Sequence, residues 1–241
     1  MRWWIAMSIV PALALVLYAA DTERKGTVHG TVINEEGKPV KGAKVKAYPT
    51  DRGPGMALPS AFTDEAGHYT IRRLWWGKLW VYGMKEDEDY PDLGMGIYLG
   101  SRLVLPITLD SRHPSAKVNI RLGPKAGVLI GNVREAVTDV PLAPCVELRL
   151  VTEPDMYVTN SGWIQGKYRI LVPSDRDVTM LIWDSEHRPW YYPGTEDKTN
   201  RTPLRLGPGE EKTLNIQLEP KNPAIKAHPA SGVAGECPPI P

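Results

Sequence analysis

The sequence predicts an all-β protein made of two tandem antiparallel β-sandwich domains. Short apolar segments alternate with turns rich in glycine and proline at even spacing, which is typical of sandwiches. A stretch of one domain's length occurs twice, over 26–122 and, more divergently, over 127–218. The join between the copies is too short for free rotation, so we expect the two domains to contact each other.

The N-terminal segment has a basic start, Met1-Arg2, followed by an apolar run over 3–20 that ends in Ala19-Ala20. This pattern is typical of a secretory signal peptide over 1–20. The run is also long enough to anchor the protein in a membrane if it is not cleaved. Both alternatives place the rest of the chain outside the cytoplasm, secreted, in the periplasm or at the cell envelope.

The first copy is expected to form strands near 27–33, 43–49, 68–73, 78–84, 102–109 and 116–122. Alternation with a period of two decides which side chains are buried. Leu79 and Val81 share one face of their strand, and Trp80 and Tyr82 share the other. The predicted core of the first domain consists of Val32, Val45, Ile71, Leu79, Val81, Val118 and Ile120.

The second copy is expected to form strands near 127–134, 145–151, 167–172, 177–183 and 212–218. Its Cys145 has two possible positions. Alternation with Val146 places it on the more solvated face, whereas alignment of Pro141 with Pro39 makes it the counterpart of the core residue Ala43. The sequence leaves open whether Cys145 pairs with Cys237, although two cysteines suit an oxidising compartment.

The C-terminal segment 219–241 is rich in proline and has few large apolar residues. Such a composition cannot bury enough apolar surface to order a chain. We expect this tail to be disordered.

Four spaced motif blocks over 26–83 closely resemble the carboxypeptidase regulatory-like domain. They are Gly30-x-Val32, Gly37-Lys38-Pro39-Val40-x-Gly42-Ala43-x-Val45, Thr63-Asp64-x-x-Gly67-x-Tyr69-x-Ile71 and Leu74-x-x-Gly77-x-x-x-Val81. The second copy resembles it less, because it lacks the Thr-Asp and Gly-Ala pairs. The resemblance implies a prealbumin-like, immunoglobulin-like or carbohydrate-binding-like β-sandwich. It also implies a non-catalytic accessory, spacer or binding module rather than a peptidase.

The sequence contains no Gly-x-Ser-x-Gly, His-Glu-x-x-His or Cys-x-x-Cys motif and no phosphate-cradling glycine loop, and its five histidines are scattered. The acidic run 86–89 with Asp92 does not match the spacing of an EF-hand loop, so we expect a solvated acidic loop. A formal net charge of +1 without a basic stripe argues against nucleic-acid binding. We therefore expect no catalytic residue, no metal site and no cofactor.

Two groups of aromatic residues are the candidate carbohydrate-binding residues, because flat rings can stack on sugars. They are Trp75, Trp76, Trp80 and Tyr82 in the first copy and Trp190, Tyr191 and Tyr192 in the second. The first hypothesis is an envelope module that binds polysaccharide. The alternative is a structural spacer or adhesion module for an envelope protein, with the rings buried between the domains. Exposed rings in a concave row favour the first hypothesis, and buried rings favour the second.

Overall fold

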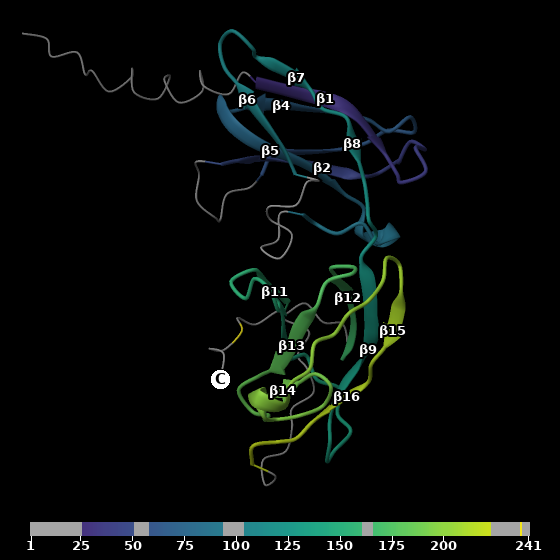
Figure 1. The fold of residues 1–241 in the computed structure, drawn as a ribbon, viewed down its shortest axis with the longest axis vertical. Helices are drawn as coiled ribbons and strands as arrows, with labels where there is room; N and C mark the ends of the chain where they lie inside the picture. The colour runs from purple at the N-terminus through teal and green to yellow at the C-terminus, as the bar shows by residue number, and fades with distance from the viewer. Residues whose placement is uncertain (1–25, 51–57, 94–103, 161–165, 223–236, 238–241) are drawn as a thin grey trace, which may run out of the picture.

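The protein is all-β in the computed structural model, which describes residues 26–50, 58–93, 104–160, 166–222 and Cys237. Two β-sandwiches follow one another along the long axis (Figure 1). The N-terminal apolar segment lies outside the described residues. Within the described part, no helix is long and apolar enough to cross a membrane.

The first sandwich consists of two four-stranded sheets. One sheet has the order β4-β1-β7, with β8 also paired to β1; its strands are β4 (His68–Leu74), β1 (Gly26–Ile33), β7 (Ser115–Lys117) and β8 (Ile120–Arg121). The other has the order β3-β2-β5-β6; its strands are β3 (Ser60–Phe62), β2 (Lys44–Pro49), β5 (Gly77–Met84) and β6 (Leu105–Leu109). Every residue of the predicted core is buried in one cluster between these sheets, which confirms the assignment of faces.

The second sandwich repeats this arrangement strand for strand. One sheet contains β12 (Lys167–Val172), β9 (Gly127–Glu135), β15 (Glu211–Thr213) and β16 (Ile216–Leu218). The other contains β11 (Tyr157–Asn160), β10 (Cys145–Leu150), β13 (Val178–Trp183) and β14 (Trp190–Tyr191). The sequence analysis missed the short strands β3, β11 and β14. In both units the last two strands run parallel to the first, so these sheets are mixed rather than purely antiparallel.

A tyrosine and a glycine fix the break between the last two strands of each unit. In the first sandwich, the Tyr69 hydroxyl donates a hydrogen bond to the Val118 carbonyl at 2.7 Å. A Cβ atom on Gly30 would lie 1.9 Å from the same oxygen, so only glycine permits this close approach. The second sandwich repeats the arrangement with Tyr168, Leu214 and Gly131. This agreement confirms the internal repeat at the level of local structure.

Cys145 lies on the outer face of its sheet, as alternation predicted, because Val146 belongs to the core. It is nevertheless only 6% exposed, since Trp183 and Tyr191 pack around it. Cys145 forms a disulfide with Cys237, which also packs against this cluster. The interpretation that made Cys145 the counterpart of the core residue Ala43 is therefore wrong.

The C-terminal segment is ordered further than we expected. The Arg188 amide donates to the Glu219 carbonyl at 2.8 Å, and the Lys221 amide donates to the Glu186 carbonyl at 2.9 Å. Residues 219–222 thus belong to the second sandwich, which corrects the predicted start of the disordered tail. Apart from Cys237, the rest of that tail lies outside the described residues.

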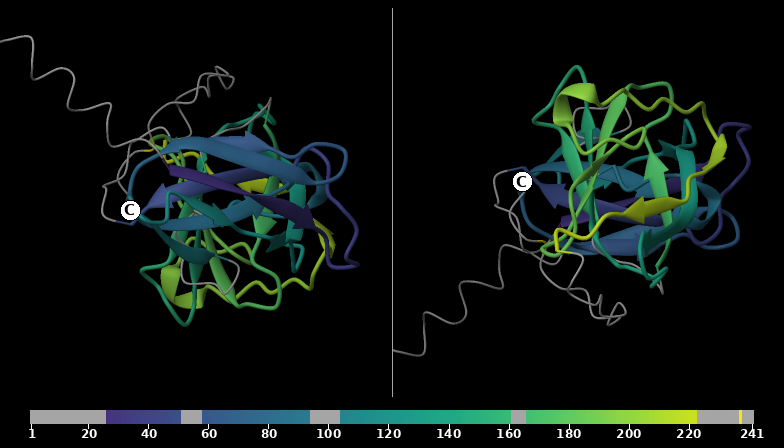
Figure 2. Two further views of the ribbon diagram at one scale, coloured as in Figure 1. Left: turned by 90° about the horizontal axis from the view of Figure 1, so that it is seen from above. Right: turned by 90° about the horizontal axis from the view of Figure 1, so that it is seen from below.

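The outer face of the sheet that contains β2 and β5 meets the second sandwich. Strands run across the long axis in the first sandwich and closer to that axis in the second, so one end of the second sandwich abuts this face (Figures 1 and 2). Tyr82, Met84 and Leu93 join the core cluster of the second sandwich. Main-chain and ionic contacts add to the interface: the Ala126 amide donates to the Asp89 carbonyl at 2.9 Å.

The acidic run, which was expected to be a solvated loop, is partly used in structure. Residues Glu86–Glu88 form a short 3-10 helix with no buried residue. Asp89, however, forms an ion pair with Arg169 of the second sandwich, and Asp92 forms one with Lys46. For these two carboxylates the expectation of a solvated loop is wrong, because each lies close to a base that the sequence places far away.

Candidate functional site

The first aromatic group does not form an exposed row. Trp75 is 6% exposed and Tyr82 only 1% exposed. Trp80 is half-buried and stacks on Tyr48, with ring centroids 6.0 Å apart, and Trp76 is 38% exposed. A stacking platform must present ring faces to solvent. The prediction that Trp75 and Tyr82 bind carbohydrate is therefore wrong, because both rings are buried. Their burial, with Tyr82 between the sandwiches, is the outcome expected of a structural role.

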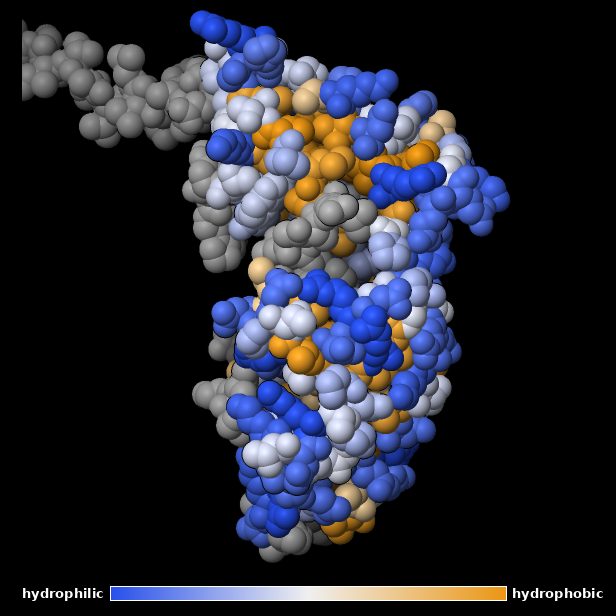
Figure 3. All heavy atoms as spheres, in the orientation of Figure 1, coloured by the Kyte–Doolittle hydropathy of each residue, from blue (hydrophilic) through white to orange (hydrophobic). Residues whose placement is uncertain are grey.

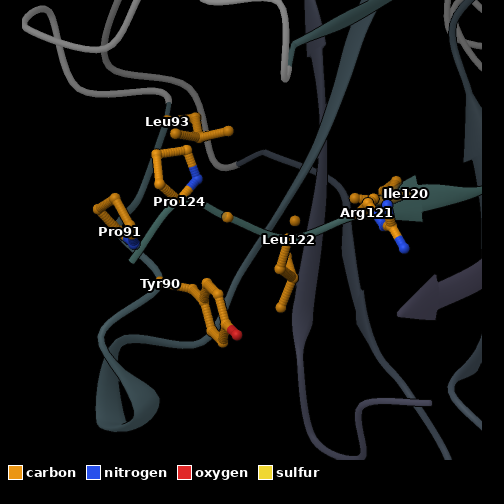
Figure 4. A pocket seen from close by; sticks show the side chains of 9 residues that line it. Tyr90, Pro91, Leu93, Ile120, Arg121, Leu122 and Pro124 are labelled. Carbon is orange, nitrogen blue, oxygen red and sulfur yellow. The ribbon is translucent and has the colours of Figure 1, made fainter. Parts of the chain in front are cut away.

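The described residues at the junction between the sandwiches enclose a small cavity. A cavity of about 10 Å³ lies there, between Tyr90, Leu93, Leu122 and Pro124 (Figure 4). This volume holds roughly one water molecule. Among the described residues, the junction is therefore a packed contact at this point.

The second aromatic group is divided between two surfaces by strand alternation. Tyr191 points to the outer face, is 5% exposed and packs beside Cys145. The prediction that its ring stacks on a sugar is therefore wrong. Trp190 and Tyr192 are half-buried and pack against the inner core. Their rings meet edge to face, with centroids 6.4 Å apart. Lys212 from β15 donates to the Tyr192 hydroxyl at 2.9 Å, which ties these rings to the opposite sheet.

A groove of about 490 Å³ lies beside Trp190, which we call the Trp190 groove. Its other lining residues come from β9 and from the chain leading into and through β16: Asn132, Arg134, Asn215, Ile216 and Gln217. The groove therefore combines one indole with three side-chain amides and a guanidinium. Trp190 is the single predicted site residue that lines it; the sequence analysis did not select the amide residues.

Three of the polar side chains in the Trp190 groove are held in place. The Asn215 side-chain oxygen accepts hydrogen bonds from the Asn132 amide nitrogens of main chain and side chain, both at 3.2 Å. Arg134 donates to the carbonyl and carboxylate of Asp139 at 2.6 and 2.9 Å. These hydrogen bonds hold the side chains in fixed positions. They leave further amide donors and acceptors of the same side chains for a ligand. Asparagine and glutamine side chains offer both functions, which suits hydroxyl ligands.

The first sandwich has the same strand break without the indole. There the Asn119 side-chain oxygen accepts from the amide and hydroxyl of Thr31, both at 3.2 Å. The strand that corresponds to β14 is β6, whose residues Leu105–Leu109 include no aromatic side chain. In the part of the first copy that the structure describes, the strand break therefore has no counterpart of Trp190.

A buried histidine forms the other concentration of titratable groups. His187 is 2% exposed; its Nδ1 lies 2.9 Å from the Asp184 carboxylate and its Nε2 lies 3.5 Å from that of Glu135. Burial acts to lower the pKa of His187, but these carboxylates outweigh it and raise the pKa above 6.5. Burial acts to raise the pKa of Asp184, whereas hydrogen bonds from His187 lower it on balance. Sequence reasoning did not identify this cluster.

His187 lies at the base of the C-terminal segment, where it pairs with Pro220 in an isolated bridge. A cavity of about 170 Å³ beside it is lined by Glu135, Ser185 and Lys221, among others. Among the described residues, no group of three or more histidine, cysteine, aspartate or glutamate side chains is arranged to hold a metal ion. His187 thus connects β9 and the turn after β13 through its carboxylate partners, and it connects to the C-terminal segment through its main-chain bridge to Pro220.

Comparison with protein-family models and with curated proteins gives no match. The resemblance to the carboxypeptidase regulatory-like domain therefore stays a prediction.

Similar solved structures include the TIE protein of Bacillus anthracis, with a TM-score of 0.32, 13% identity and 82% of this chain covered. This chain spans about a third, 34%, of that protein. The shaft pilin SpaA of Lactobacillus rhamnosus GG has a TM-score of 0.33 and 9% identity, with 82% of this chain and 98% of the pilin covered. A candidate carbohydrate binding protein of Pseudomonas aeruginosa has a TM-score of 0.28 and 13% identity, with 47% of this chain and 99% of that protein covered. At such low TM-scores, these similarities carry no conclusion about this chain.

Proposed function

We propose that this protein is an exported, non-catalytic accessory module of the cell envelope that binds polysaccharide in the Trp190 groove. The observation that supports this proposal is a half-buried indole in a groove lined by three side-chain amides. A sugar ring presents an apolar face and a rim of hydroxyl groups. The indole suits the first and the amides suit the second.

The size and rigidity of the groove fit this use. Its volume of about 490 Å³ lies within the range of about 300–1,000 Å³ that is typical of small-molecule sites. Asn215 and Asn132 hold each other, so a ligand would order few additional side chains. Less ordering means a smaller entropic cost of binding.

Export is supported by the N-terminal sequence and by the Cys145–Cys237 disulfide, since disulfides persist mainly in oxidising compartments. The proposal of a non-catalytic role is supported by the absence of catalytic motifs from the sequence.

The second candidate function is a structural spacer or an adhesion module that binds another envelope protein. It is favoured by the packing of Tyr82 between the sandwiches, which makes the pair of domains a continuous unit. Hydrophobic side chains also gather on the first sandwich around β6 and β8, whereas the second sandwich is mostly hydrophilic in the same view (Figure 3). Leu105 and Ile107 are half-buried there.

A polysaccharide panel with variants of the Trp190 groove tests the first proposal. We expect Trp190→Ala and Gln217→Ala each to weaken binding about tenfold, which corresponds to about 1.4 kcal/mol. Gln217 is exposed, so its replacement leaves the fold intact, and melting curves check both variants. Phe62→Ala is the matched control, because Phe62 is also an exposed aromatic residue but lies outside this groove.

The result that contradicts the first proposal is equal binding by the Gln217→Ala variant and the wild-type protein. Failure of the wild-type protein to bind any polysaccharide in the panel would leave the structural role ahead.

A further inference from the structure

The outer face of the second sandwich carries a separate pocket of about 360 Å³, which we call the cationic pocket. It lies over β10 and β13, and Tyr191 of β14 forms part of its wall. Trp190, the neighbour of Tyr191, lines the Trp190 groove. Strand β14 therefore contributes consecutive residues to two different concave surfaces.

The internal repeat explains why this pocket is open. In the first sandwich, the equivalent face of β2 and β5 is covered by the second sandwich through Tyr82 and Met84. In the second sandwich, Cys237 packs at the end of the face that holds Cys145 and Trp183. The other end, where Arg149 pairs with Thr179 across the strands, remains open as the cationic pocket.

One acid and one base in the pocket compensate each other. Glu147 is 3% exposed, and its two carboxylate oxygens accept hydrogen bonds from Arg149 Nε at 2.5 Å and Nη2 at 2.8 Å. Arg149 also donates from Nη1 to the Pro154 carbonyl at 2.9 Å, and its guanidinium lies 4.7 Å from the Tyr157 ring centroid. Arg149 is therefore a fixed wall of the pocket with its charge neutralised.

Two further bases in the pocket are not compensated. Among the described residues, neither Lys198 nor Arg201 forms a salt bridge or a hydrogen bond through its side chain. Both belong to the turn around the 3-10 helix Lys198–Asn200, which Asp197 caps by accepting a hydrogen bond from the Thr199 amide at 2.8 Å. The four charged residues that line the pocket thus give a net charge of +2, from three bases and one acid.

We infer that the cationic pocket binds the carboxylate of an acidic sugar unit, an inference that rests on the proposed polysaccharide function. Arg201 and Lys198 supply charge-assisted donors for a carboxylate. The Thr179 hydroxyl and the wall formed by Tyr191 suit the hydroxyls and the ring of the same unit. The volume accommodates a sugar ring as well as its charged group, which is more than a small free anion requires.

A pair of matched ligands separates charge recognition from general glycan binding. The probes are oligogalacturonate and its fully methyl-esterified form, which share a backbone and differ in charge. By isothermal titration with the full-length mature protein, we expect the acid form to bind at least about tenfold more tightly at low ionic strength. The preference should fall as salt is added, because exposed charges are screened.

The variants assign that preference to the pocket. The double variant Lys198→Ala/Arg201→Ala is expected to bind both forms equally. Its matched control is Arg188→Ala/Arg205→Ala, which removes the same charge from exposed bases of the same sandwich. The control should keep the tenfold preference. An equal loss in both double variants would overturn the inference, because the preference would then reflect net charge.

The remaining outcomes distinguish the inference from the proposed function. Binding of both forms that depends on Trp190 but shows no acid preference would overturn the inference and leave the proposed function standing. An acid preference that depends on Lys198 and Arg201 but is unaffected by Trp190→Ala would support the inference and contradict the Trp190 groove. Competition by inorganic phosphate as effectively as by monomeric galacturonate would overturn the assignment to a sugar acid.

Discussion

Replacing Tyr82 by alanine is expected to lower the free energy of unfolding by about 3–5 kcal/mol, the range for truncation of a buried aromatic side chain. Tyr82 is 1% exposed, and its ring packs with the core cluster of the second sandwich. The deletion therefore leaves a cavity where the two sandwiches meet. For a folded region of this size, such a loss corresponds to a decrease in melting temperature on the order of 10 °C.

The hydroxyl of Tyr82 makes the prediction sharper. Among the described residues it has no hydrogen-bond partner, although it is buried. Tyr82→Phe removes this unpaired polar group, so the variant should be as stable as the wild-type protein or more stable. Tyr69→Phe is the matched control, because the Tyr69 hydroxyl does donate to Val118 at 2.7 Å. We expect that change to cost about 1 kcal/mol.

Urea denaturation followed by tryptophan fluorescence measures all three variants. Trp76→Ala, at an exposed ring, should change the free energy of unfolding by less than about 0.5 kcal/mol. If Tyr82→Ala lowers the free energy of unfolding by less than about 1 kcal/mol, the ring does not seal the interface as described. If Tyr82→Phe is less stable than Tyr69→Phe, the Tyr82 hydroxyl is not unpaired as described.

Three other changes have expected outcomes that equilibrium unfolding can check. Gly131→Ala should destabilise the protein by several kcal/mol, of the order of 3, because its Cβ would lie 2.0 Å from the Leu214 carbonyl oxygen; unchanged stability would contradict the close approach. Cys237→Ser should lower the free energy of unfolding by up to about 4–5 kcal/mol, since the disulfide spans 92 residues. If the oxidised wild-type protein melts at the same temperature as the reduced wild-type protein and the variant, that result would argue against the bond. The pKa of His187 is raised above 6.5 and that of Asp184 is lowered below 3.8, so their mutual stabilisation is complete between these values. This stabilisation should be lost as the pH rises through the folded pKa of His187 or falls through the folded pKa of Asp184. His187→Asn should abolish the loss at alkaline pH. A wild-type free energy of unfolding that does not change from pH 6 to 9 would refute this prediction.

The strands and their inner faces could be predicted because their signals are local. Val45, Leu79 and Val81 alternate with polar or aromatic neighbours, and all three are buried in the first core. The motif Gly67-x-Tyr69 recurs as Gly166-x-Tyr168, and the two tyrosines make equivalent hydrogen bonds in the structure. The short strands β3, β11 and β14 were missed because two to four residues carry too little periodic signal.

The sequence by itself determined the all-β class, the repeat and the side of each main strand that faces the core. Only the tertiary structure decided what happens to the side chains on the other side. Tyr82 is covered by the second sandwich, whereas Arg149 and Thr179, on the equivalent face of the second sandwich, line the open cationic pocket. The physical reason is that alternation fixes the direction of a side chain within its strand, whereas its exposure depends on which distant segment packs over that face.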